Sequence, residues 1–281
     1  MQTFSEERLI GGPKDLPISF DVTFNPDGRK MPVIIFCHGF KGFKDWGAWH
    51  LVAKSMAEAG FFFVKVNFSH NGVRSTDLSD ITDAEAFGNN NFSLELDDLR
   101  ELLDWLVTDN EEYRHYIDED DVSLIGHSRG AITVLLKTLE DERIKRVITW
   151  AGAFNINKFV SLEDDAIWRE QGFVNVVNGR TKDKYPVGYQ LKQDYLDNEE
   201  RLNLQAKIKH LDQPLMMIHG DNDEVAPISN SQKINSAITH ALFLTLEGNH
   251  TFGASHPWTD ENLPEDLEDV VNETIEFLRL D

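Results

Sequence analysis

Short apolar runs and stretches of helical periodicity alternate along most of this chain, and this alternation restricts the fold more than any other feature. The apolar runs have the β-branched and aromatic bias of buried strands, whereas the stretches between them repeat apolar residues at helical spacing. Strands that alternate with helices predict an α/β fold with a doubly wound, mostly parallel sheet. The expected strands are residues 32–37, 61–68, 122–125, 147–150, 214–218 and 241–246, and the expected helices are 49–59, 94–107, 131–139, 230–238 and 267–278.

Two segments depart from this rhythm. Residues 18–24 (ISFDVTF) alternate like a half-exposed strand and are followed by the turn-like sequence NPDGRK, so we expect an N-terminal antiparallel hairpin that leads into the sheet. Residues 155–211 contain no clear core strand, and a connection of this length needs structure of its own. We therefore expect one domain over residues 1–281, with an inserted helical cap at 155–211.

The charge of the chain argues against several classes of partner. Lys and Arg total 27 against 49 Asp and Glu, which gives a formal net charge of -22. An acidic surface repels phosphate backbones and anionic lipid headgroups, so we expect no nucleic-acid and no membrane binding. The single cysteine, Cys37, allows no intramolecular disulfide, and the first residues lack the pattern of a secretory signal. We expect a soluble, cytoplasmic protein that acts on a small molecule.

The pentapeptide GHSRG at residues 126–130 fits the pattern G-x-S-x-G. It follows an expected strand and precedes an expected helix, which is the strand–turn–helix setting of a nucleophile elbow. A sharp turn brings the neighbouring backbone close together, and side chains in place of Gly126 and Gly130 would collide there. A serine that caps an ordinary helix would explain Ser128 but not both glycines. Ser128 is therefore the candidate nucleophile.

A serine nucleophile needs a base, and the base needs an acid that orients it. The loop HGDNDEVAP follows one expected strand and offers the acids Asp221, Asp223 and Glu224. The loop LEGNHTF follows the last expected strand and contains His250. Because ligand sites of open α/β sheets lie at the carboxyl ends of the strands, we expect the serine, one acid and His250 at the same edge, in that chain order.

Together these motifs resemble those of the α/β-hydrolase superfamily of serine hydrolases, over about residues 31–278. Within the superfamily the chain is similar to capped esterases of the dienelactone-hydrolase-like and cinnamoyl or feruloyl esterase type. The loop HGDNDEVAP matches the family pattern HG-x-x-D-x-x-x-P, which implies that Asp223 is the acid rather than Asp221 or Glu224. The sequence GNHTF matches the family ending G-x-H-x-F, which implies that His250 is the base. The resemblance implies an α/β-hydrolase fold and a carboxylic ester hydrolase.

Acyl transfer also requires N–H donors that stabilise the negative charge on the carbonyl oxygen. One donor is expected from the backbone N–H of Arg129, the residue after the nucleophile. The glycine-rich sequence HGFKGFKDWGAW, which follows the expected strand at 32–37, is the candidate for the other. By the resemblance, the second donor is the backbone N–H of Phe40. Taken alone, this loop is equally well explained as a strand-to-helix turn.

The residues that contact substrate are less constrained by the sequence. Trp168, Tyr185 and Tyr189 belong to the expected cap, where their rings could wall a pocket for an apolar or aromatic acyl group. They could equally pack the cap onto the sheet. His70 lies in the polar loop after residues 61–68, where it could contact substrate or close the turn.

No zinc-ligand spacing and no phosphate-binding loop occurs in the sequence, so we expect neither a metal nor a cofactor. These features favour the hydrolysis of small soluble esters, aromatic esters among them, through an acyl-enzyme on Ser128. A thioesterase or a peptidase would use the same triad. A non-catalytic ligand-binding protein with the same fold is the alternative from a different class.

Overall fold

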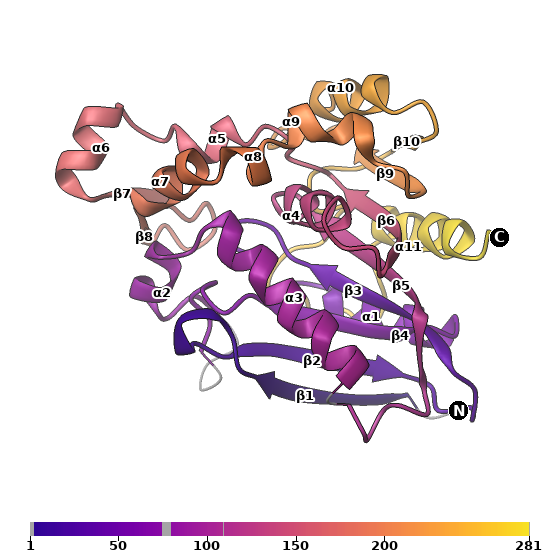
Figure 1. Ribbon diagram of the computed structural model, residues 1–281. Helices are drawn as coiled ribbons and strands as arrows, with labels where there is room; N and C mark the ends of the chain where they lie inside the picture. Colours follow the sequence, from indigo (N-terminus) through magenta and orange to yellow (C-terminus); the bar gives the residue numbers. More distant parts are fainter. Residues whose placement is uncertain (1–2, 75–79, 109, 281) are drawn as a thin grey trace.

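The computed structural model describes residues 3–74, 80–108 and 110–280, and in this part of the chain eight strands form one sheet (Figure 1). The strands of this sheet are β1 (Phe4–Ile10), β2 (Ile18–Phe24), β3 (Met31–Cys37), β4 (Phe62–Asn67), β5 (Ile117–His127), β6 (Ile144–Trp150), β9 (Leu215–Gly220) and β10 (Leu242–Leu246). Their order across the sheet is β1-β2-β4-β3-β5-β6-β9-β10. All neighbouring pairs from β4 to β10 are parallel, as the alternation of strands and helices predicts.

Helices cover both faces of the sheet, and each face has its own hydrophobic core. Along β3, the side chains of Val33 and Ile35 enter one core and those of Ile34 and Phe36 enter the other, because successive residues of a strand point to opposite faces. The helices of the first face are α3 (Phe92–Thr108), α4 (Gly130–Thr138) and α10 (Ser229–Ala237), and those of the second are α1 (Trp49–Glu58) and α11 (Glu265–Leu278). No helix within the described ranges is long and apolar enough to cross a membrane.

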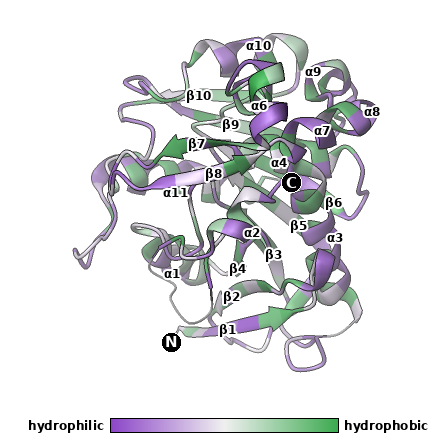
Figure 2. Ribbon diagram, turned by 90° about the vertical axis from the view of Figure 1, so that its left-hand side faces the viewer, coloured by the Kyte–Doolittle hydropathy of each residue, from purple (hydrophilic) through white to green (hydrophobic). Residues whose placement is uncertain are grey.

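An N-terminal antiparallel hairpin is present, but β1 and β2 form it. The expected turn NPDGRK does not close a hairpin, because β2 pairs with β1 and β4 and not with β3, the strand that follows the turn. The strand β1 is mostly polar in the middle, where Figure 2 shows it in purple, and its sequence did not indicate a strand. The strand β2 also pairs with β4, so six of its seven residues are buried rather than half-exposed. The polar side of β2 can be buried because its Asp21 forms ion pairs with the buried Lys44 and Lys65.

The segment between β6 and β9 forms a cap that contains β-structure as well as helices. Besides helices it holds an antiparallel hairpin of two strands, which the sequence did not indicate. The second strand of this hairpin packs against the short helix α2 (Ala84–Gly88), and Figure 1 shows the cap in pink to orange above α2. The elements of the cap are α5 (Asn157–Val160), α6 (Asp165–Gln171), β7 (Phe173–Val177), β8 (Lys184–Gly188), α7 (Gln190–Asp197), α8 (Glu199–Leu202) and α9 (Leu204–Lys207).

Candidate active site

Ser128 stands in a tight turn between β5 and α4, with a left-handed backbone φ of 55°. A Cβ atom at Gly126 would lie 2.4 Å from the carbonyl oxygen of Gly130, and one at Gly130 would lie 2.5 Å from that of Cys37. Both positions therefore require glycine. A positive φ at a non-glycine residue is a strained backbone conformation. The N–H of Ser128 donates a hydrogen bond to the carbonyl of Trp150 at 2.9 Å, and this bond helps to hold the serine in that conformation. The turn places the serine hydroxyl at the carboxyl edge of the sheet.

Two further loops at this edge bring an imidazole and a carboxylate to Ser128. His250, after β10, places its Nε2 atom 2.9 Å from Oγ of Ser128. The Nδ1 atom of the same ring lies 2.7 Å from Oδ2 of Asp223, after β9. Because an ionised carboxylate only accepts hydrogen bonds, Nδ1 carries the hydrogen and Nε2 is left to accept the serine proton. The three side chains form one hydrogen-bonded chain.

The carboxylate of Asp223 is surrounded by donors. Its side chain is 1% exposed, and its Oδ1 accepts the backbone N–H groups of Val225 and Ala226, both at 2.8 Å. Burial alone would raise the pKa of Asp223, but hydrogen bonds from His219, His250 and the backbone of Ala226 outweigh it and hold that pKa well below its ordinary value. The carboxylate is therefore ionised at neutral pH and can stabilise a positive charge on His250.

Asp221, the nearest alternative acid, has a different partner. Its Oδ1 accepts the backbone N–H of Gly248 at 3.2 Å. The two loops touch at this point, because a Cβ atom at Gly220 would lie only 2.3 Å from the carbonyl oxygen of Gly248. Asp221 thus links the loops after β9 and β10, whereas Asp223 reaches the imidazole.

The loop after β3 lies directly against Ser128. A Cβ atom at Gly39 would lie 2.8 Å from Cβ and 3.3 Å from Oγ of Ser128, so only glycine fits there. His38 holds this loop: its Nε2 accepts a hydrogen bond from Asn71 at 3.2 Å, and its Nδ1 donates to the carbonyl of Gly39 at 2.9 Å. Burial lowers the pKa of His38 to about 4, which keeps the ring neutral and consistent with this pattern.

The two expected oxyanion donors, the backbone N–H groups of Phe40 and Arg129, flank the serine. Arg129 immediately precedes α4, and Phe40 follows Gly39 in the loop after β3. Among the described residues, neither N–H has a hydrogen-bond acceptor. Both N–H groups therefore remain free to donate, as the donors of an oxyanion hole must be.

The side chain of Arg129 has a separate role, inside the protein. Its Nη2 lies 3.1 Å from Oε1 of Glu95 in α3, and its guanidinium carbon lies 4.4 Å from the centre of the Phe92 ring. Glu95 is also buried and accepts a hydrogen bond from Thr133 at 2.6 Å. The sequence does not single out Glu95, because it reads as one of many charges along an amphipathic helix.

His127 supports the loop that carries His250. Its Nε2 lies 2.8 Å from the carbonyl oxygen of His250, and burial lowers the pKa of His127 to about 3. The neutral ring therefore donates to that carbonyl. This is a packing and loop-holding role rather than a second base.

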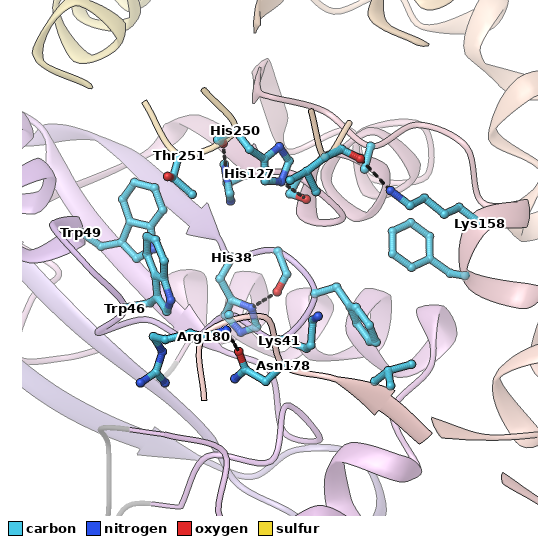
Figure 3. A pocket seen from close by; sticks show the side chains of 18 of the residues that line it. His38, Lys41, Trp46, Trp49, His127, Lys158, Asn178, Arg180, His250 and Thr251 are labelled. Atoms are coloured by element: carbon cyan, nitrogen blue, oxygen red, sulfur yellow. Dashed lines mark hydrogen bonds between the residues drawn. The ribbon is translucent and has the colours of Figure 1, made fainter. Parts of the chain in front are cut away.

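A cavity of about 430 Å³ opens beside Ser128 and His250. Its apolar walls come from the loop after β3 and from the cap, and Figure 3 shows Trp46 and Trp49 on its left and Lys158 on its right. Such a cavity with a few convergent polar groups is the usual form of a small-molecule site. In the described ranges, no group of three or more His, Cys, Asp or Glu side chains is arranged to hold a metal ion. The main apolar side chains of the cavity are Phe40, Trp46, Trp49, Phe159, Leu162 and Val176.

The three cap aromatics suggested as substrate contacts do not line this cavity. Trp168 is completely buried, and its Nε1 donates to the carbonyl of Val187 at 3.0 Å. Tyr185 packs against α2, and the hydroxyl of Tyr189 donates to Asp165 at 3.0 Å. These rings hold the cap together and onto the rest of the protein, which was the alternative explanation for them.

His70 also lies outside the cavity, buried at the turn after β4. Its Nδ1 lies 2.8 Å from Oγ of Ser69, which in turn donates to Asp98 at 3.0 Å. Burial raises the pKa of Asp98 to about 8. His70 therefore belongs to a buried hydrogen-bond network at this turn and not to the wall of the cavity.

Comparison with known proteins supports this assignment of the fold. Among solved structures, Est1E from Butyrivibrio proteoclasticus has a TM-score of 0.71 and 16% identity over 97% of both chains. A structure of Est1E with ferulic acid bound also has a TM-score of 0.71 and 16% identity, over 94% of this chain and 95% of that one. A putative hydrolase from Agrobacterium vitis S4 has a TM-score of 0.70 and 15% identity, over 99% of this chain and 100% of the other. At these identities the similarity establishes the α/β-hydrolase fold.

The sequence comparison identifies the family. No curated protein sequence matches the chain. The BD-FAE family profile, however, matches residues 20–238, which is well over half of the chain. The chain therefore belongs to the BD-FAE family, and it is an esterase-type hydrolase with the α/β-hydrolase fold.

Proposed function

We propose that the protein is a serine carboxylic ester hydrolase that works through an acyl-enzyme. The observation that carries this proposal is the hydrogen-bonded chain from Ser128 through His250 to Asp223 at the wall of an apolar cavity. The unpaired N–H groups of Phe40 and Arg129 supply the remaining requirement of acyl transfer.

In the first step, Oγ of Ser128 attacks the ester carbonyl while Nε2 of His250 takes the hydroxyl proton. Asp223 keeps the imidazole in the required tautomer and stabilises its positive charge. The oxyanion is held by the two backbone N–H groups. His250 then returns the proton to the departing alcohol, and the acyl group remains on Ser128.

The second step repeats this chemistry with water. His250 removes a proton from a water molecule, which attacks the carbonyl of the acyl-enzyme. The tetrahedral intermediate collapses, Oγ of Ser128 takes the proton back from His250, and the carboxylic acid is released.

The cavity favours esters of small apolar or aromatic acids. Its volume of about 430 Å³ suits a molecule of that size, and its rings, such as Phe40 and Phe159, offer an apolar surface. Est1E, which shares the fold, has been solved with ferulic acid bound. We therefore include methyl ferulate beside 4-nitrophenyl butyrate as a test substrate.

Labelling with a fluorophosphonate probe tests the proposal directly. The wild-type protein should label and should hydrolyse 4-nitrophenyl butyrate, and Ser128→Ala should lose both properties while its circular dichroism spectrum stays the same. Ser236→Ala, at an exposed serine of α10, is the matched control and should retain both. Labelling or turnover that survives in Ser128→Ala would exclude Ser128 as the nucleophile.

The same experiment separates the alternatives. A folded wild-type protein that neither labels nor turns over any ester would be a ligand-binding protein. A protein that labels but prefers acyl-CoA or peptide 4-nitroanilide substrates over esters would be a thioesterase or a peptidase with the same triad.

A further inference from the structure

The cavity beside Ser128 carries an excess of positive charge, although the chain as a whole has a net charge of -22. Lys41, Lys158 and Arg180 line the cavity, and none of its described lining residues carries a carboxylate. Arg180 is neutralised by Asp80, at 2.8 Å. The two lysines are therefore the unbalanced charges of the site.

Neither lysine has an acidic partner in the part of the chain that the structure describes. Nζ of Lys41 donates to the carbonyl of Val177 at 3.0 Å, and Nζ of Lys158 donates to the carbonyl of Val225 at 2.7 Å. An ammonium group has three hydrogens to donate, so each lysine retains donors for a ligand. In a chain with almost twice as many acidic as basic residues, two such lysines in one cavity are not a consequence of composition.

The two ammonium groups also act on each other. Lys41 follows Phe40 in the loop after β3, whereas Lys158 belongs to α5 of the cap, so two segments far apart in sequence bring them together. Burial and the charge of Lys158 both lower the pKa of Lys41. Two like charges in one cavity repel each other, and a bound anion relieves this repulsion.

An apolar wall adjoins the two charges. Phe40 and Phe159 are the sequence neighbours of Lys41 and Lys158, and their ring centroids lie 5.8 Å apart. Nζ of Lys41 lies 5.7 Å from the centre of the Phe40 ring. A ligand that combines an apolar body with a terminal negative charge would match both features.

We propose that the site selects esters that also carry a free carboxylate, which Lys41 and Lys158 receive. The substrate class would be half-esters of dicarboxylic acids, or esters of hydroxy acids, with an apolar chain or ring between the two functional groups. This inference rests on the proposed function, because it names the substrate class of the same site.

A different explanation for the two lysines is purely structural. Their bonds to Val177 and Val225 join the loop after β3 to the cap hairpin, and the cap to the loop that carries Asp223. Lysines with that role alone would affect all esters alike. The test must therefore compare substrates that differ only in charge.

Two matched pairs of esters provide this comparison. For a charge on the acid side, kcat/KM is measured for mono-4-nitrophenyl adipate and for methyl 4-nitrophenyl adipate. For a charge on the alcohol side, release of acetate is measured from 5-acetoxypentanoate and from 5-acetoxypentanamide. The wild-type protein should prefer the anionic member of at least one pair about tenfold, and 1 M NaCl should weaken the preference because it shortens the screening length to about 3 Å.

The variants Lys41→Gln and Lys158→Gln remove the charge but keep a donor for each carbonyl. Each should lower the ratio of anionic to neutral kcat/KM about threefold, and the double variant should bring the ratio close to one. Lys145→Gln is the matched control, because Lys145 also donates to a backbone carbonyl, that of Glu142 at 3.2 Å, near the opposite end of β6. Its ratio should equal that of the wild-type protein.

The proposal is overturned if the wild-type protein shows no preference in either pair, or if the preference survives in the double variant. Equal losses on both members of a pair would show that the lysines only hold the cap. A different outcome would contradict the proposed function itself: neither member of any pair is hydrolysed, and Ser128 does not label. Hydrolysis of the neutral esters without any charge preference would contradict the carboxylate proposal alone.

Discussion

The Nδ1 atom of His250 lies 2.7 Å from Oδ2 of Asp223, across the ends of two neighbouring strands, β9 and β10. The same carboxylate accepts two backbone N–H groups of its own loop and lies 3.2 Å from the buried ring of His219. These contacts leave the carboxylate little freedom, and the imidazole is turned so that Nε2 faces Ser128. The contacts of the loop after β9 thus determine that Asp223, and not Asp221, pairs with the imidazole of His250.

Replacing Asp223 tests this relationship. Asp223→Asn should lower kcat for 4-nitrophenyl butyrate by roughly 10,000-fold, because the amide stabilises the wrong tautomer of His250. Asp221→Asn is the matched change two residues earlier and should stay within about threefold of wild type, since Asp221 bonds Gly248 and not the imidazole. A greater loss in Asp221→Asn would show that the acid is assigned to the wrong residue.

Because Gly39 lies so close to Ser128, we expect that replacing Gly39 impairs catalysis. In Gly39→Ala the new methyl group would meet Cβ of Ser128 at 2.8 Å and must push the loop that carries the N–H of Phe40 away. We expect kcat to fall about 100-fold, as it does when one oxyanion donor is lost. Gly11→Ala is the control, because a Cβ atom there has no neighbour within 4 Å. Full activity in Gly39→Ala would argue against the placement of this loop.

The buried pair of Arg129 and Glu95 makes a prediction about stability. Glu95→Ala leaves the guanidinium of Arg129 unpaired in the interior, so the free energy of unfolding in urea should fall by about 4 kcal/mol. Glu58→Ala removes a partner from the exposed pair with Lys54, and should change the same quantity by less than about 0.5 kcal/mol.

A double variant separates the side chain of Arg129 from its backbone. Glu95→Gln with Arg129→Met removes both buried charges and keeps the backbone N–H that is expected to bind the oxyanion. The double variant should recover most of the lost stability and retain turnover of 4-nitrophenyl butyrate. An inactive but stable double variant would mean that the guanidinium itself takes part in the reaction.

The raised pKa of Asp98 leads us to expect that the free energy of unfolding depends on pH. Its pKa in the folded protein, about 8, lies above the ordinary value of 3.8, so the folded state holds the proton more tightly than the unfolded chain. The resulting stabilisation is complete below pH 3.8 and is lost as the pH rises towards 8. Asp98→Asn cannot ionise, and should raise the free energy of unfolding by roughly 5 kcal/mol at pH 9 with little change at pH 4.

The control for this pH dependence is Asp269→Asn, at an exposed position of α11. It should leave the difference in unfolding free energy between the two pH values unchanged. An equal effect of Asp98→Asn at both pH values would show that Asp98 is already ionised in the folded protein at pH 4.

The amino-acid sequence predicts the parts of this protein that depend on local patterns. The apolar runs indicate the parallel strands, because a strand covered on both faces is apolar throughout. Gly126 and Gly130 indicate the turn at Ser128, because close backbone contacts exclude side chains. The loops with Asp223 and His250 follow predicted strands, and the carboxyl ends of parallel strands must lie at one edge.

Other parts depend on contacts between segments that are far apart in the chain. The mostly polar β1 is a strand because β2 offers it an open edge, and Glu95 is important because Arg129 lies against it inside the protein.

The sequence by itself therefore determined the parallel part of the sheet, the turn at Ser128 and the order of Ser128, Asp223 and His250. The tertiary structure decided that Phe40 and Phe159, and not Trp168 or Tyr185, line the cavity, and it placed Lys41 and Lys158 at the wall of that same cavity. The physical reason is that periodicity records which side of an element is apolar, whereas only packing decides which surface that side meets.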